Sequence, residues 1–388
     1  MNEAVSYVPT TFAAIAGWND DDHAAAFAAF LLSAPRVLER DAGSTAASGT
    51  RRRPSPELVE VCRRALEGRT SGNDRAAARE FFERHFTPYQ IVYGAGAQSA
   101  GLLTGYYEPQ LTGSRTRNDQ FRVPVYKRPH DLVNLMDEAE RGARAGQQTH
   151  ARQTDEGLVP YFTRAEIDQG ALGGRNLELG YVADPVDLFF MQVQGSGLID
   201  FGGDDVVRLT YAGKNGYDYT SIGRHLIDTG EIASEDMTLQ VLIDWLKADP
   251  VRARDVMWKN ESYVFFEELG KASETSARGV DGIVLSAGRS LAVDTAFHEI
   301  GTPVFVSSAG LVHANPAGAS ENGFNRLMIA QDVGSAIKGP ERGDVYFGSG
   351  FEAGLLAGQT KHEARFIVLR SHRLDVAQHP AALAGLAS

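Results

Sequence analysis

The chain has 388 residues, of which 43% are hydrophobic and 23% charged. This balance is typical of a soluble globular protein that is long enough for two domains, each with its own core. The formal net charge of −12 argues against nucleic acid as a partner, because phosphate binding needs clustered lysine and arginine.

Three helices are predicted in the first hundred residues. The first follows the acidic run at residues 19–22, which supplies a helix cap ahead of an apolar stripe. The second begins at Pro56, a residue that suits the first helical position, and ends at Gly68. The third begins after Asp74. We expect the three helices to form a packing layer whose aromatic residues belong to the core.

The first long strand is expected at residues 102–107, Leu-Leu-Thr-Gly-Tyr-Tyr. Successive side chains of a strand alternate between faces, so Thr104 and Tyr106 share one face. The pattern alone leaves two roles open for these residues, lining a groove or filling a barrel core. The glycine-rich stretch at residues 94–101 has the wrong spacing for a dinucleotide-binding loop, and no helix follows it.

Residues 108–258 are predicted to form a second unit inserted into the first. A capped helical turn is expected at residues 163–166, and longer helices at residues 219–228 and 238–246. The polar stretch at residues 137–154 is expected to be an excursion or a helix.

One segment of this unit carries candidate ligand-binding side chains, Leu-Phe-Phe-Met-Gln-Val-Gln-Gly-Ser-Gly at residues 188–197. If it is a strand, Gln192 and Gln194 lie in line on one face. Amides and glycines beside aromatic rings are typical of a polysaccharide cleft, because sugar hydroxyls need hydrogen bonds and sugar faces need flat apolar surface. Paired glutamines on a solvated strand face are the competing interpretation.

From residue 260 to residue 369, short strands and Gly/Pro turns recur with almost no helical period, which indicates a β-barrel. Residues 326–350 predict two of these strands, joined by a glycine-rich loop.

Two aspartates flank that loop, Asp332 at the end of the first strand and Asp344 at the start of the second. Alternation puts Asp344 and Tyr346 on the face opposite Val345. This pattern is typical of a carboxyl group held on rigid elements at the edge of a cleft. It is also typical of aspartates that only cap turns.

Several of these segments resemble one known family. Three blocks are similar to the membrane-bound lytic murein transglycosylase A family, at residues 103–109, 190–197 and 211–216. The C-terminal part resembles the 3D domain, named for three aspartates, which fall here on Asp294, Asp332 and Asp344. The resemblance covers residue 103 to about residue 369. In one departure, the loop before Asp344 is a residue longer than expected, and Ser335 stands where glycine is usual.

The resemblance implies a mainly β fold with an N-terminal α-helical layer. It further implies a double-psi β-barrel whose first part, residues 1–107, supplies the helices and the first barrel strand. Residues 259–388 complete that barrel as the 3D domain. The β-rich unit of residues 108–258 is inserted between them, and a substrate groove is expected between the two units.

The resemblance also implies an activity, cleavage of the β-1,4 bond between N-acetylmuramic acid and N-acetylglucosamine in peptidoglycan. The family's single catalytic aspartate falls on Asp344, which acts first as acid and then as base. The 6-hydroxyl of muramic acid replaces water and leaves a 1,6-anhydro sugar. Asp332 and Asp294 are expected to shape its surroundings. The expected groove residues are Thr104, Gly105, Tyr106, Gln192, Gln194, Gly195 and Ser196.

Such an acid must be protonated at working pH, although a free aspartate titrates near ~3.9. Protonation of the leaving oxygen is required because an oxocarbenium ion forms as the glycosidic bond breaks. Partial burial in the groove, or the negative charge of a nearby Asp332, is expected to raise the pKa of Asp344.

The sequence is compatible with four other interpretations to different degrees. A non-catalytic peptidoglycan-binding barrel and a two-carboxylate glycoside hydrolase on the same barrel both stay open. Residues 335–338 spell the Ser-x-x-Lys of penicillin-interacting enzymes, but the companion motifs are missing. A zinc hydrolase is not supported, because His298-Glu299 lacks the second histidine of the zinc motif.

The expected partners are peptidoglycan glycan strands, with no nucleic acid, cofactor or metal, and we expect a monomer. Family members are typically exported and often lipid-anchored, whereas no signal peptide or lipid-attachment cysteine is visible near the start of this sequence. We therefore expect a mature or trimmed form that acts in the periplasm, with any outer-membrane association depending on a segment outside this sequence. The single cysteine, Cys62, excludes an internal disulfide.

Overall fold

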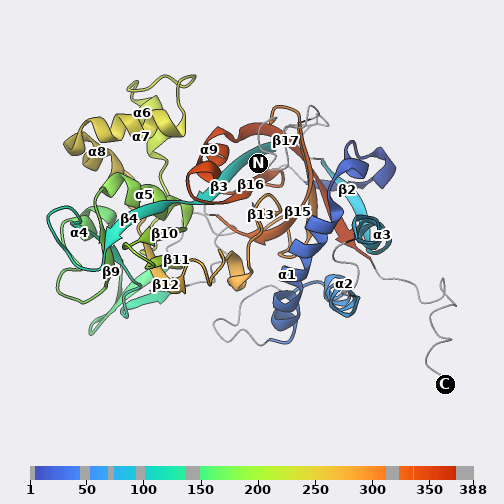
Figure 1. Ribbon diagram of the computed structural model, residues 1–388, viewed down its shortest axis with the longest axis horizontal. Helices are drawn as coiled ribbons and strands as arrows, with labels where there is room; N and C mark the ends of the chain where they lie inside the picture. Colours follow the sequence, from blue (N-terminus) through green and yellow to red (C-terminus); the bar gives the residue numbers. More distant parts are fainter. Residues whose placement is uncertain are drawn as a thin grey trace.

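The computed structural model describes residues 5–43, 53–68, 74–92, 101–135, 149–311, 323–334 and 336–372. Figure 1 shows two sheet-containing units side by side, crossed by one long path of chain that runs from β3 into β4. The fold is mainly β with an N-terminal helical layer, as predicted. No helix among the described residues is both long and apolar enough to cross a bilayer.

The first unit is built on an eight-stranded sheet. Its strands, in spatial order, are β1 (Ser6–Pro9), β2 (Phe86–Val92), β17 (Lys361–Ser371), β14 (Pro303–Ser308), β15 (Phe324–Asp332), β13 (Ser290–Val293), β16 (Arg342–Ser349) and β3 (Gly101–Glu108). Strand β17 also pairs antiparallel with β3. Consecutive pairings therefore run from β17 through β14, β15, β13, β16 and β3 back to β17. The strands predicted on either side of the Asp344 loop are β15 and β16.

The N-terminal helices pack against this sheet, beside β15 and β2 (Figure 1). They are α1 (His23–Asp41), α2 (Pro56–Glu67) and α3 (Arg75–His85). The predicted caps hold, because Asp22 accepts from the Ala25 amide and Asp74 accepts from the Ala76 amide. Phe30 of α1 packs in one buried cluster with sheet residues that include Phe305. Strand β1 precedes these helices and was not predicted.

The second unit contains a six-stranded sheet and a three-stranded sheet. The larger one has the order β12 (Val264–Lys271), β11 (Val206–Lys214), β10 (Ser196–Asp200), β4 (Gln110–Ser114), β9 (Glu178–Val182) and β5 (Val123–Tyr126). The smaller one consists of β6 (Leu132–Asn134), β7 (His150–Thr154) and β8 (Gly157–Val159). The sequence prediction ended the second unit at residue 258. Strand β12 belongs to the six-stranded sheet of this unit and lies beyond that residue.

Helices are more prominent in the second unit than the predicted β-rich description suggests. They are α4 (Arg164–Asp168), α5 (Pro185–Gln194), α6 (Ile222–Asp228), α7 (Leu239–Ala248) and α8 (Pro250–Met257). The predicted capping box is present at the start of α4, between Thr163 and Glu166. Figure 1 shows α6, α7 and α8 together at one end of the molecule. Of the polar stretch at 137–154, residues 150–154 form β7, and the remainder up to residue 148 lies outside the described residues.

The prediction of a strand through the two glutamines is wrong, because residues 185–194 form α5. The Asp184 side chain accepts from the Val186 amide at 2.8 Å, and Pro185 occupies the first helical position. Gly195 ends the helix with a left-handed φ of 83°, which favours glycine. The following strand, β10, begins only at Ser196.

The weak helical period of residues 260–369 gave no prediction of α9 (Phe351–Gln359), which follows β16 directly. Its small residues allow it to pack closely on β3. A Cβ on Gly354 would lie 2.8 Å from the Tyr107 ring, and one on Gly105 would lie 2.9 Å from the Ala357 Cα. Glycines lower helix propensity, so the sequence signal for this helix is weak.

A buried ion pair joins the two units where β3 leaves the first sheet. The Arg208 Nε of β11 lies 3.2 Å from a Glu108 carboxylate oxygen, and neither side chain has more than 9% of its surface exposed. The same oxygen accepts from the Ser349 hydroxyl at 2.5 Å. Arg208 also donates to the Thr275 carbonyl. The end of β3 is thereby attached to both β16 and β11.

We expect Arg208→Met to destabilise the protein by about 3–5 kcal/mol, because the Glu108 charge would stay buried without its partner. Urea unfolding at neutral pH measures this loss. The matched control is Arg224→Met, which removes the exposed pair with Asp228 and should cost about 0.5 kcal/mol or less. Equal losses of unfolding free energy in the two variants would show that the buried pair stabilises the protein no more than the exposed pair does. Glu108→Gln combined with Arg208→Met should recover part of the stability.

Candidate active site

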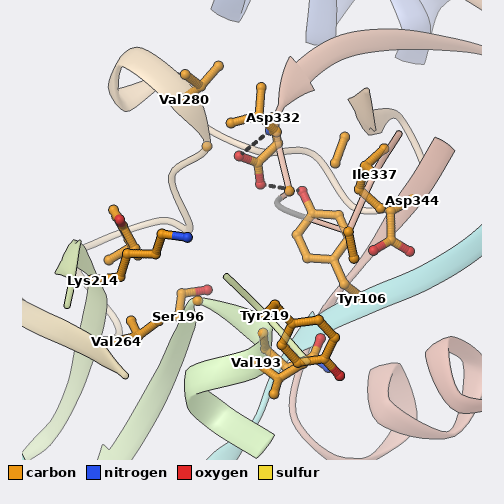
Figure 2. A pocket seen from close by; sticks show the side chains of 18 of the residues that line it. Tyr106, Val193, Ser196, Lys214, Tyr219, Val264, Val280, Asp332, Ile337 and Asp344 are labelled. Atoms are coloured by element: carbon orange, nitrogen blue, oxygen red, sulfur yellow. Dashed lines mark hydrogen bonds between the residues drawn. The ribbon is translucent and has the colours of Figure 1, made fainter. Parts of the chain in front are cut away.

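A cavity with a volume of about 500 Å³ lies between the two units. Figure 2 shows aspartates of the first unit on one wall and Ser196 and Lys214 of the second unit on the other. The predicted site residues that line the cavity are Gly105, Tyr106, Gln192, Gln194, Gly195, Ser196, Asp294, Asp332 and Asp344. Thr104 lies behind this lining, against Asp344.

Asp344 is positioned by the parallel pairing of β16 with β3, which sets it opposite Thr104. The Thr104 hydroxyl donates to Asp344 Oδ1 at 2.5 Å. Within the described parts of the chain, no hydrogen bond engages the second oxygen, Oδ2. Burial raises the pKa of Asp344, against the smaller lowering effects of the Thr104 hydroxyl and the Arg342 charge. One carboxyl oxygen is thus held and the other is available to a ligand in the cavity.

Asp332, at the end of β15, is held at both oxygens. The Tyr106 hydroxyl donates to Oδ2 at 2.8 Å, and the Val333 amide donates to Oδ1 at 2.9 Å (Figure 2). Burial raises the pKa of Asp332 to about 6, and the negative charge of Asp344 adds to the effect. Tyr106 therefore has a polar role at the site, although its side chain is buried.

A short 3-10 turn, η5 (Val280–Gly282), covers Asp332 and connects it to the helical layer. The Val280 backbone lies close enough to the Asp332 carboxylate to lower the pKa of that group. Asp281 has a left-handed φ of 59°, a conformation that costs a non-glycine residue energy. Its carboxylate pairs with Arg40 of α1 at 3.3 Å, with both side chains almost fully buried.

Asp294 anchors the loop that leads to Asp344. Its Oδ2 accepts from the Gly339 amide at 2.8 Å, and its Oδ1 accepts from the Ala296 amide. Nearby, His298 Nε2 lies 2.6 Å from the Pro340 carbonyl. Because a carbonyl oxygen only accepts, this nitrogen carries the proton. The loop is fixed at two consecutive residues just before β16.

On the opposite wall, the two glutamines serve the protein's own structure. Gln192 accepts from Arg164 at 2.7 Å and donates to the Val264 carbonyl. Gln194 accepts from the Tyr107 amide at 3.0 Å, which connects α5 to β3. Their positions differ because residues two apart on a helix do not face the same way.

The sequence prediction missed several cavity residues, including Lys214, Tyr219, Arg342 and the turn at 279–282. Lys214 and Tyr219 lie in or just after the block at residues 211–216 that carries the family resemblance. Arg342 is two residues before Asp344, so strand alternation puts it on the same face. The turn carries no comparable local signal. Ser335 of the Ser-x-x-Lys match and most of the glycine-rich stretch lie outside the described residues.

No group of three or more His, Cys, Asp or Glu side chains within the described ranges is arranged to hold a metal ion.

Comparison with known proteins connects this arrangement to a family. The MltA specific insert domain matches residues 102–267, and the 3D domain matches residues 289–370. The membrane-bound lytic murein transglycosylase A of Escherichia coli strain K12 is 35% identical over 281 residues, which cover 71% of this chain and 68% of that protein. The chain belongs to the membrane-bound lytic murein transglycosylase A family. The relative from Vibrio cholerae is also 35% identical, over 70% of this chain and 66% of its own length.

Solved structures of this family cover nearly the whole chain. A membrane-bound lytic murein transglycosylase from Agrobacterium tumefaciens has a TM-score of 0.79 at 34% identity and covers 94% of this chain and 98% of its own. MltA from Neisseria gonorrhoeae has a TM-score of 0.71 at 30% identity, covering 96% and 94%. Escherichia coli MltA with bound chitohexaose has a TM-score of 0.65 at 28% identity, covering 96% of both chains.

We expect Tyr106→Phe to raise the pKa of Asp332 above 6 by about one pH unit, because a hydrogen bond that stabilises the charged carboxylate is lost. Carbon-13 NMR of labelled aspartate carboxyls across a pH titration measures the change, with Asp332→Asn identifying the resonance. Tyr217→Phe is the control, since its hydroxyl donates to the Tyr161 carbonyl within the second unit. An unchanged or lower pKa in Tyr106→Phe would contradict the described geometry.

Proposed function

We propose that the protein is a lytic transglycosylase that cleaves the β-1,4 bond between N-acetylmuramic acid and N-acetylglucosamine in peptidoglycan. Asp344 is the single acid and base, and the product carries a 1,6-anhydro-N-acetylmuramic acid end. The observation that carries this assignment is the contrast between two carboxyl groups at the cavity. Asp332 has both oxygens hydrogen-bonded to the protein, whereas only one oxygen of Asp344 is held, by Thr104.

The reaction follows from one carboxyl group acting twice. Protonated Asp344 donates its proton to the glycosidic oxygen, and the bond from that oxygen to C1 of the muramic acid breaks. The bonding electrons leave with the oxygen, which becomes the 4-hydroxyl of the departing N-acetylglucosamine. The 6-hydroxyl oxygen then attacks C1 of the oxocarbenium ion, and its proton passes to the Asp344 carboxylate. The acid is regenerated and no water is consumed.

The raised pKa of Asp344 supports its role as the first proton donor. Burial disfavours the ionised carboxylate, so a larger fraction of Asp344 is protonated than of an exposed aspartate at the same pH. Thr104 fixes the orientation of the group by holding Oδ1. Asp332 influences Asp344 through its charge. Asp294 influences it by anchoring the loop before β16.

Family membership supports a glycan ligand for the cavity, since one relative from Escherichia coli has been solved with bound chitohexaose. We extend this to the Gly105, Gln194, Gly195 and Ser196 surface as the floor of a groove for peptidoglycan strands. The ring of pairings from β17 through β3 supports a double-psi β-barrel as the first unit. We also propose periplasmic action by a monomer, with association with the outer membrane, because the relatives are named membrane-bound.

A two-carboxylate glycoside hydrolase is the second candidate, favoured by one observation. Asp332, with a pKa of about 6, has the protonation behaviour of a general acid near neutral pH and lines the same cavity as Asp344. Its engagement at both oxygens argues against this role, because it leaves no oxygen aimed at a ligand.

Asp344→Asn should lower the release of anhydro-muropeptides from purified sacculi by at least about 10³-fold, since the variant has no proton to give at this place. Mass spectrometry of the released fragments measures the product and its ends. Digestion in ¹⁸O-labelled water separates the two candidates, because a hydrolase places the label in a new reducing end and a lytic transglycosylase does not. Release of labelled reducing ends by the parent enzyme would replace the proposal with hydrolysis. Sacculus binding without release by either form would favour the non-catalytic barrel.

Asp332→Asn should retain activity within about tenfold at its pH optimum, since this residue is not the proton donor. The charges of the two carboxylates repel each other, so an ionised Asp332 favours the protonated form of Asp344. Loss of that charge should move the alkaline fall in activity to lower pH. Initial rates on soluble glycan strands between pH 4 and pH 9 measure both effects. A loss as complete as in Asp344→Asn would identify Asp332 as the acid.

A further inference from the structure

Positive side chains gather on the cavity wall that carries the aspartates. Arg342, Lys338 and Arg278 all line it, each from a segment next to Asp344, Asp294 or Asp332. The chain as a whole has a formal net charge of −12, so cations at this place are not explained by overall composition. Together these three residues are called the cationic rim.

Arg342 differs in its partners from two other poorly exposed arginines, Arg208 and Arg289. Arg208 and Arg289 each pair with a buried carboxylate, Glu108 and Asp21 respectively. Arg342 is half-buried and donates to the Gly343 carbonyl. In the described ranges of the chain, no carboxylate lies within salt-bridge distance of Arg342 or of Lys338. A partly desolvated guanidinium with only a neutral acceptor is a ready partner for an anion from outside.

The place of Arg342 is unfavourable for an acid that must be protonated. Arg342 and Asp344 are two residues apart on β16 and therefore share a face. The positive charge lowers the pKa of Asp344, which opposes the protonated form. A ligand anion on Arg342 would offset that charge. Binding of such a ligand and protonation of the acid would then support each other.

Resting on the proposed function, we propose that the cationic rim, with Arg342 at its centre, binds carboxylate groups of the glycan strand and selects such strands over neutral β-1,4 glycans. Murein offers carboxylates from two sources, the peptide stems and the lactyl group of muramic acid once its stem has been removed. The guanidinium fork suits either one, because it matches a carboxylate with two parallel hydrogen bonds. Arg342 is thus a specificity residue beside the proton donor.

The test measures affinity in an Asp344→Asn background, which is neutral like the protonated acid and leaves the strands uncut. Isothermal titration calorimetry compares three ligands: soluble strands with peptide stems, strands whose stems an amidase has removed, and neutral chitohexaose. Adding Arg342→Gln should weaken binding of the carboxylate-bearing strands by about tenfold. Binding of chitohexaose should change by less than about twofold.

Three further variants make the comparison specific. Arg342→Lys keeps the charge but loses the fork, and should recover only part of the affinity. Lys338→Gln, an exposed position, should weaken stem-bearing strands by only about two- to threefold. Arg84→Gln on α3 removes the same charge away from the cavity and should change nothing. Thermal unfolding of each variant verifies that the fold is intact, and Lys338→Gln tests the rim if Arg342→Gln does not fold.

The outcomes distinguish the two sources of carboxylate and decide whether the cationic rim binds carboxylates. A loss confined to stem-bearing strands assigns the stem carboxylates, and a loss also on stem-free strands assigns the lactyl carboxylate. An equal loss on chitohexaose, or no loss on any strand, overturns the proposal. The proposed activity is judged separately, because absence of anhydro ends from the parent digest would reject the reaction while leaving these affinities interpretable.

Discussion

The parallel pairing of β3 with β16 is the constraint on which the site depends. Its register sets Thr104 opposite Asp344 and Tyr106 opposite Tyr346. A slip by one residue would turn every one of these side chains to the other face. The close approach needs glycine on β3, because a Cβ on Gly105 would lie 2.4 Å from the Phe347 ring. Asp344, the hydroxyl that orients it and the tyrosine that holds Asp332 are therefore fixed by one pair of strands.

The electrostatics of the site balance burial against a few specific partners. Burial raises the pKa of both Asp344 and Asp332. Hydrogen bonds from Thr104 and Tyr106 act in the opposite direction, since they stabilise the charged forms. The difference between the two aspartates is mostly one of hydrogen bonding, with one oxygen held in Asp344 and two in Asp332. Two neighbouring carboxyl groups of the same chemistry are thereby placed in different environments.

Features governed by local chemistry could be predicted from the sequence. The caps at Asp22 and Asp74 and the two strands around the Asp344 loop are of this kind. The strand predicted through Gln192 failed because alternating polar residues were given more weight than the Asp-Pro start and glycine end of α5. Helix α9 was missed because its glycines and alanines serve close packing on β3 and carry little helical pattern.

The remaining site features depend on contacts between distant parts of the chain. The position of Asp344 at the start of a strand could be predicted from the sequence, whereas Arg342 could be found only by considering which residues share its strand face. Nothing local in the sequence connects Arg40 with Asp281, which are brought together only by the packed fold. The same holds for the pairing of Glu108 with Arg208 across the two units. Side-chain partners at long sequence separation have no short-range signature.

The Arg40–Asp281 pair connects the N-terminal helices to the candidate active site. Helix α1 holds the strained turn at Asp281, and the neighbouring Val280 backbone lowers the pKa of Asp332. A shortened enzyme starting after α1 would keep all three aspartates yet lose the support that shapes the environment of one of them. The two matched family segments, residues 102–267 and 289–370, do not include this helix and its support.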